Sequence, residues 1–276
     1  WGSISGEFNS VSLPVLSPGL VWRQSQLYSD GRLSIKESSG VDSGILFWFS
    51  SFDMDYITQQ DNYVINWQNL NDSGLSVSND NVSKAPSLGY DVSLGDHYLL
   101  FDGVDDYLSI ENVESIDFDA MSIVLVVWPE FDSEPQTILS LRDGTNVINM
   151  SIEAFTEIAR FKVQDSVGTT EMGSYSLRYN APNLIVGTYS SEGQYIYVNG
   201  GFKLGMRNVA RGNRSVSDVL IGAAWSGSSY MDHYSGRMME VMVYDYALTD
   251  NEVMMLENFI RSKWSVYLSR MPYIFE

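Results

Sequence analysis

Short apolar runs alternate with polar clusters along most of the chain. The apolar runs are rich in Val, Ile, Tyr and Phe, and clusters of Gly, Ser, Asn and Asp separate them. Runs of this length bounded by turn residues predict many short antiparallel strands. The expected fold is therefore all-β, either a sandwich or a jelly roll. The longest apolar run, IVLVVW at Ile123–Trp128, predicts a strand buried on both faces.

Two local patterns predict a hairpin and a helix. In YIYVNGGFKLG, Asn199 and Gly200 tolerate the positive φ of a tight turn between alternating strands. In LTDNEVMMLENFIRSKW, Thr249 and Glu252 have the spacing of a capping box, which predicts the start of one short C-terminal helix. The residues of this helix that form one apolar stripe are Val253, Leu256, Ile260 and Trp264.

The N-terminal segment has a different composition. Residues 1–43 are rich in Ser and Gly and supply only short candidate strands. A segment with so little apolar content needs another surface to lie on. Two interpretations stay open: this arm packs along its own domain, or it attaches to a neighbouring subunit. The expected organisation is an extended N-terminal arm at 1–43 and one sandwich domain at 44–276.

Charge and composition exclude several classes of function. The 276 residues carry a formal net charge of −19, which disfavours nucleic acid, because phosphate binding needs Lys and Arg. The absence of Cys excludes disulfides, thiolate nucleophiles and zinc–thiolate sites. His97 and His233 lie far apart, and no nucleophile elbow accompanies either of them. No apolar run is long enough for a transmembrane helix, so membrane insertion is not expected.

Six segments between about Gly44 and Trp264 follow one another in a specific order. They are ILFWFSSFDMDYI, VINWQNLNDSG, LLFDGVDDYLSI, MSIVLVVWP, GQYIYVNGGF and the closing stretch that runs from VLIGAAWSG to ENFIRSKW. Each segment alone is a weak signal, but their order and spacing together resemble the laminin G-like domains of bacteria and phages. The resemblance implies the concanavalin A-like jelly roll of the lectin and glucanase family, an all-β sandwich of two antiparallel sheets packed face to face.

The string FDGVDDY concentrates three aspartates and a glycine between two apolar runs. A tight turn explains it, because Gly103 permits positive φ and aspartate side chains accept hydrogen bonds from nearby backbone N–H groups. In this interpretation Phe101 and Tyr107 flank the bend and face the core. The turn is the preferred interpretation of this string.

Two loops also carry weak candidates for a metal site. Asp105 and Asp106 in FDGVDDY, and Asp143 and Asn146 in LRDGTN, offer the oxygen ligands that Ca²⁺ prefers. Turn formation explains the second loop equally well. Ca²⁺ is therefore the candidate ion, and no cofactor is required.

The arrangement of acidic residues argues against catalysis. Retaining glycosidases need two carboxylates about 5–5.5 Å apart, and residues two apart on a strand point to the same face at about that separation. The laminarinase-type relatives carry this as an E-x-D-x-E strand, which this chain lacks. Glu240 and Asp245 are five apart and on opposite faces, and Asp117 and Asp119 lack a third acid. We therefore expect no enzymatic activity.

The loop AAWSGSSYMDHY offers candidates for glycan binding. Trp225 and Tyr230 are flanked by Gly and Ser, and Asp232 and His233 follow them. Aromatic faces and polar hydrogen-bonding groups hold sugars, so these four residues are the candidate ligand site. The alternative is that the two aromatic residues cap the edge of the sandwich. Tyr234 is expected in the core.

These features favour a non-enzymatic adhesion or structural protein. The first interpretation is a component of a phage virion, either a tail fibre, a receptor-binding protein or a capsid decoration. Its partners would be other virion proteins or copies of itself, contacted through the N-terminal arm, together with a surface glycan. The alternative is a secreted or cell-surface bacterial carbohydrate-binding module, Ca²⁺-dependent if the acidic loops bind the ion.

Overall fold

The computed structural model describes residues 13–14, 20–23, 34–71, 74–111, 116–144, 146–165, 167–201, 203–207, 215–227 and 229–264. The chain divides into two compact units, residues 1–43 and residues 44–276. In the first unit, β1 (Leu20–Arg23) pairs antiparallel with β2 (Ser34–Glu37). The second unit holds all the other elements that the structure describes.

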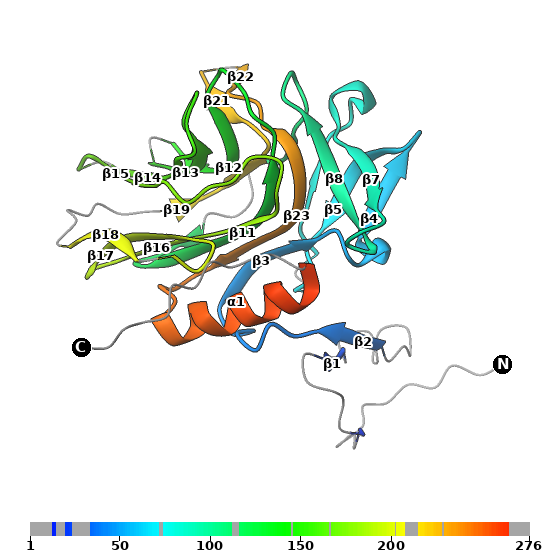
Figure 1. The fold of residues 1–276 in the computed structure, drawn as a ribbon, viewed down its shortest axis with the longest axis horizontal. Coiled ribbons are helices and arrows are strands. Elements are labelled where there is room, and N and C mark those ends of the chain that lie inside the picture. The colour runs from blue at the N-terminus through cyan, green and yellow to red at the C-terminus, as the bar shows by residue number, and fades with distance from the viewer. Residues whose placement is uncertain are drawn as a thin grey trace. The chain divides into compact units, whose positions relative to one another are not determined.

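The first sheet is built around β23 (Ser235–Tyr244) (Figure 1). One edge of β23 pairs with β11 (Met121–Pro129). The other edge pairs first with β8 (Asp96–Asp102) and then with β3 (Ile45–Ser50). The outer strands are β16 (Asn183–Ser190), β17 (Gly193–Val198) and β18 (Leu204–Arg207) beyond β11, and β7 (Ser87–Asp91) beyond β8.

The second sheet lies opposite the first and is also antiparallel. Its strands, in spatial order, are β15 (Thr169–Ser174), β14 (Ala159–Gln164), β13 (Asn146–Ile152), β12 (Gln136–Asp143), β20 (Asp218–Ile221), β9 (Leu108–Ile110), β6 (Ser76–Ser78), β5 (Tyr63–Gln68) and β4 (Ile57–Gln60). The pair Tyr63–Ser87 links the two sheets at one edge. The short elements are β10 (Ile116–Asp117), β19 (Ser215–Val216), β21 (Ala224–Ser226), β22 (Ser229–Met231), and the 3₁₀ turns η1 (Met54–Tyr56) and η2 (Val82–Lys84).

One apolar core separates the two sheets. Phe49 of β3 lies 5.5 Å from Trp67 of β5 between ring centroids. Gly187 of β16 approaches Phe161 of β14 so closely that a Cβ would lie 3.0 Å from the phenyl ring. Contacts of this kind between opposite sheets confirm the predicted two-sheet sandwich.

The predicted hairpin is confirmed, with a longer turn than the sequence suggested. Asn199 and Gly200 have φ values of 54° and 70°. However, the first paired residues are Ile196 and Leu204. The loop therefore exceeds the two residues of a tight Asn-Gly turn.

The predicted helix is α1 (Asp250–Trp264), and its capping box is confirmed. The backbone N–H of Glu252 donates to Thr249 Oγ1 at 3.3 Å, and the backbone N–H of Thr249 donates to Glu252 Oε2 at 2.8 Å. The helix packs on the outer face of the first sheet (Figure 1), where Phe259 lies edge-on to Trp48 at 6.2 Å. The buried stripe comprises Val253, Leu256, Ile260 and Trp264. In the part of the chain described, no helix is long and apolar enough to cross a membrane.

A β-bulge in β23 reorganises the outer face of this sheet. Met239 is an extra residue, because its two neighbours pair with consecutive residues of β11. A bulge shifts the alternation of side chains by one position. Met238 and Val241 therefore both lie in the core, whereas Arg237 and Glu240 both point to the outer face.

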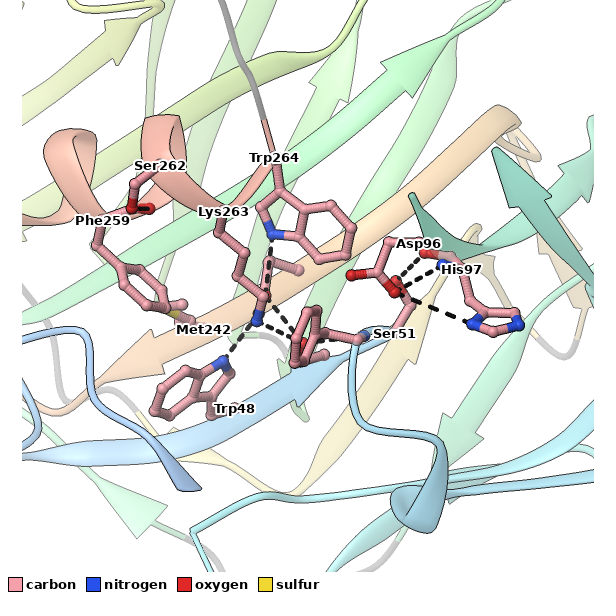
Figure 2. A network of polar contacts seen from close by, with 12 residues as sticks. Trp48, Ser51, Asp96, His97, Met242, Phe259, Ser262, Lys263 and Trp264 are labelled. Atoms are coloured by element: carbon pink, nitrogen blue, oxygen red, sulfur yellow. Dashed lines mark hydrogen bonds and ion pairs between the residues drawn. The ribbon is translucent and has the colours of Figure 1, made fainter. Parts of the chain in front are cut away.

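A buried polar network joins the sheet to α1, and Trp48, Lys263 and Trp264 point into it (Figure 2). Glu240 is the carboxylate that they contact. Its side chain is 0% exposed, and Lys263 Nζ lies 2.6 Å from Glu240 Oε1. The indole N–H groups of Trp48 and Trp264 donate to the same carboxylate at 2.8 and 3.1 Å, and the Ser50 hydroxyl donates at 2.9 Å. Donors from β3 and from the end of α1 thus replace the water that the buried carboxylate has lost.

We predict that Lys263→Met strongly destabilises the fold. Removing one partner of a buried ion pair leaves the other charge uncompensated, which costs about 3–5 kcal/mol. Urea denaturation followed by far-UV circular dichroism measures the loss in the free energy of unfolding. The matched control is Lys203→Met, because Lys203 forms an exposed pair with Asp250 at 2.9 Å, and such pairs contribute about 0–1 kcal/mol. Equal effects of the two substitutions would contradict the role of the buried pair.

Candidate recognition site

The loop that follows β8 is the turn that the sequence predicts. Gly103 has a φ of 76°. Asp102 Oδ1 accepts a hydrogen bond from the backbone N–H of Val104 at 2.8 Å. Asp106 Oδ2 accepts one from the backbone N–H of Asp102 at 2.9 Å. Phe101, at the start of the loop, is buried as expected.

The same turn brings three carboxylates together. Oxygen atoms of Asp102, Asp105 and Asp106 lie within 4.8 Å of one another. Burial, together with the neighbouring negative charges of Asp102 and Asp105, raises the pKa of Asp106 to about 7. Lys84 Nζ lies 3.6 Å from Asp105 and offsets part of this negative charge. These three groups could supply oxygen ligands to a hard cation such as Ca²⁺.

A second segment, distant in sequence, meets this loop. The β21–β22 hairpin pairs Trp225 directly with Tyr230. The Tyr230 ring lies 4.4 Å from that of Tyr107, and its hydroxyl donates to Glu111 at 2.8 Å. The guanidinium of Arg142 lies 4.3 Å from the centroid of the Trp225 ring. Both aromatic candidates are thus half-buried and in contact with other side chains. The expectation that Tyr107 faces the core is wrong, because its ring is half-buried against Tyr230 in this loop.

Asp232 and His233 continue from this hairpin to the acidic loop. Asp232 has a φ of 52°, and its carbonyl accepts from the backbone N–H of Thr137 at 2.7 Å. Burial raises the pKa of the Asp232 carboxyl group. His233 Nδ1 lies 3.4 Å from the backbone carbonyl of Asp106. Tyr234 is fully buried, as expected. We call residues 102–107, 223–227 and 229–234 together the rim.

The remaining metal candidates lie in another turn. Asp143 and Asn146 oppose each other at the tip of the β12–β13 hairpin, and Gly144 between them has a φ of 57°. The structure therefore gathers Asp105 and Asp106 with Asp102, and it leaves Asp143 and Asn146 paired with each other as turn residues.

A second surface, which no pattern in the sequence indicates, lies on the outer face of the first sheet. Trp128 of β11 pairs with Arg237 of β23. The guanidinium of Arg237 lies 4.4 Å from the Trp128 ring centroid and 4.5 Å from the ring centroid of Tyr98 on β8. It also forms an ion pair with Asp91 of β7. We call these four residues the platform; each comes from a different strand, so no local motif could have revealed them.

Several solved structures share this fold. The receptor-binding domain of botulinum neurotoxin D aligns with a TM-score of 0.57 at 9% identity, covering 78% of this chain and 52% of that one. The binding domain of Paraclostridial mosquitocidal protein 1 aligns with a TM-score of 0.57 at 12% identity, with the same coverage. This chain thus spans about half of each toxin domain.

A third structure matches over nearly its whole length. Domain 4 of AbnA, an extracellular arabinanase from Geobacillus stearothermophilus solved in complex with arabinotriose, aligns with a TM-score of 0.54 at 14% identity. The alignment covers 77% of this chain and 98% of that domain. Likeness at this level of identity shows a common fold. No curated protein matches the sequence.

A family model gives the relationship at the level of sequence. The model described as the concanavalin A-like lectin/glucanases superfamily, of the laminin G type, matches residues 102–254. This segment is more than half of the chain, and it begins in the acidic loop and ends in α1. The chain belongs to the concanavalin A-like lectin/glucanases superfamily.

Proposed function

We propose that this chain is a non-catalytic recognition module that binds a carbohydrate on a surface or receptor. The observation that carries the proposal is the rim itself. Two segments more than a hundred residues apart converge to place three carboxylates beside the contacting, tilted rings of Tyr107 and Tyr230. Aromatic faces next to a few convergent polar groups are the usual composition of a small-ligand site.

One unsatisfied donor supports the location of this site. The indole N–H of Trp225 is buried and has no hydrogen-bond acceptor within the described residues. A buried donor without a partner costs about 1–3 kcal/mol. A ligand hydroxyl that reached this indole after a small movement of Arg142 would remove that penalty. The arabinotriose complex of the structurally similar arabinanase domain is consistent with a sugar as the ligand.

A second candidate function is structural, as part of a phage virion. The motivating observation is the separate first unit, which contains the two-stranded β1–β2 hairpin. An isolated two-stranded hairpin is at best marginally stable in water, so its stability must come from contacts beyond those two strands. In this proposal the arm attaches to other virion proteins or to another copy, and the rim binds a host glycan. The alternative location is the bacterial exterior or cell surface.

The glycan proposal predicts that Trp225→Ala abolishes most carbohydrate binding. We expect the array signal to fall about tenfold, which corresponds to about 1.4 kcal/mol, because the aromatic hairpin loses its central ring. The matched control is Tyr175→Ala, since Tyr175 is 76% exposed outside the rim, and it should bind normally. Incubation of the bound glycans should release no new reducing ends. Unchanged binding by Trp225→Ala, or turnover by the wild type, would refute the proposal.

Asp106→Asn tests the acidic loop through pH. The pKa of this carboxyl rises from about 3.8 in the unfolded chain to about 7 in the folded protein. Such a group stabilises the fold at pH values below its unfolded-state pKa, and this contribution is lost as the pH rises through about 7. The amide keeps an acceptor for the Asp102 N–H and removes the charge. The free energy of unfolding of the variant should therefore exceed that of the wild type by roughly 1–3 kcal/mol near pH 8, and this difference should disappear near pH 4. Urea denaturation at the two pH values measures it.

The same variant tests the Ca²⁺ interpretation. If the three carboxylates bind the ion, millimolar CaCl₂ near pH 8 should raise the melting temperature of the wild type and leave Asp106→Asn unchanged. Equal responses of both proteins would assign the loop to turn formation alone.

Deletion of residues 1–43 tests the role of the arm. We expect the full chain to self-associate and the remaining residues 44–276 to be monomeric, because the second unit has its own core. Light scattering coupled to size-exclusion chromatography measures both masses. An unchanged number of subunits after the deletion would show that the arm is not the assembly segment.

A further inference from the structure

The platform carries hydrogen-bond donors that the protein itself does not use. Within the described part of the chain, the indole N–H of Trp128 and the hydroxyl of Tyr98 have no hydrogen-bond partner, and the guanidinium of Arg237 makes polar contact only with Asp91, through one terminal nitrogen. The described residues include a few buried side-chain atoms that lack a hydrogen-bond partner, and these groups of the platform are not among them. They therefore reach the solvent, in contrast to the buried indole N–H of Trp225.

The platform is also held rigidly before any ligand arrives. The Tyr98 ring lies over Gly89 of β7, where a Cβ would come 2.3 Å from the ring. Arg237 is fixed by its ion pair with Asp91 and by cation–π contact with the rings of Tyr98 and Trp128. The Arg237 side chain is 26% exposed. Preorganised aromatic and guanidinium groups lose little entropy on binding.

We propose that the platform is a binding site for an uncharged saccharide. The apolar C–H face of a sugar ring fits against aromatic rings, and its hydroxyl oxygens accept from the outward-facing donors of Trp128, Arg237 and Tyr98. The charge of Arg237 is compensated by Asp91, so the platform has no net positive charge to attract an anion.

The wider electrostatics also select against an acidic sugar. Leu100 of β8 pairs with Arg237 of β23. Asp102 lies two residues further along β8, on the same face, and it is exposed, so it adds a negative charge near the platform. The whole chain has a formal net charge of −19, which repels carboxylated glycans. This inference rests on the proposed carbohydrate function, and it adds a second sugar-binding surface on the sheet to the one at the rim.

The test is isothermal titration calorimetry of the full chain with a fixed panel of probes. The neutral probes are arabinotriose, cellotriose, maltotriose and mannotriose, and the acidic probe is trigalacturonate. The key variant is Tyr98→Phe combined with Trp128→Phe, which keeps two aromatic rings and removes two donors. We expect the affinity for a neutral probe to fall about fivefold or more, since each lost hydrogen bond weakens binding by a modest amount.

A matched control lies at the opposite edge of the same sheet. Tyr195 lies over Gly205 as Tyr98 lies over Gly89, and Lys203 Nζ lies 4.3 Å from its ring centroid. Tyr195→Phe should leave the affinity unchanged. Arg237→Lys is the second variant: it keeps the positive charge and loses the planar donors, so it too should weaken binding while the melting curve reports whether the fold is intact.

Each outcome of the titration decides between the proposals. Weakened binding in both platform variants, with Tyr195→Phe unaffected, supports the platform. Wild-type affinity in the platform variants together with loss in Trp225→Ala overturns the platform and leaves the rim function standing. Binding of trigalacturonate in preference to every neutral probe overturns the proposed ligand class. No binding of any probe by the wild type overturns both proposals.

Discussion

A buried carboxylate at the junction of sheet and helix organises the second unit. A carboxylate removed from water must receive replacement hydrogen bonds and a compensating charge, and Glu240 receives them from both ends of this unit. Trp48 and Ser50 belong to β3, its first strand, whereas Lys263 and Trp264 end its last helix. The network can form only when β3, β23 and α1 are all in place, so it couples the docking of the helix to the closure of the sheet.

The parts of this fold that the sequence predicted are those set by neighbouring residues. The capping box needs only Thr249 and Glu252, and the helical stripe follows from spacing within α1. The extra residue Met239 is different, because a bulge exists only relative to the strand beside it. Without knowledge of that pairing, simple alternation from Arg237 would place Glu240 in the core. The sequence could not reveal the buried network for this reason.

The candidate sites show the same limit. Trp225, Tyr230, Asp232 and His233 were grouped because they lie in one loop, and the structure does keep them together and adds the acidic loop. Trp225 contacts Arg142 and Tyr230 contacts Glu111, and each pair is far apart in the sequence. These contacts could not be predicted from the sequence for that reason. Trp128 was included in a run expected to be buried on both faces, yet it is the residue of that run that is only partly buried.

The bulge connects the stability of the fold to its recognition surface. By inserting one residue, it turns both Arg237 and Glu240 to the outer face of the same strand. Glu240 lies beneath the end of α1, whereas Arg237 lies nearer the acidic loop, against Trp128 and Tyr98. Restoring regular alternation would send one of the two charged side chains into the apolar core, which is strongly unfavourable. One irregularity in β23 therefore serves two requirements: it lets the helix dock, and it leaves an aromatic and guanidinium surface facing the solvent.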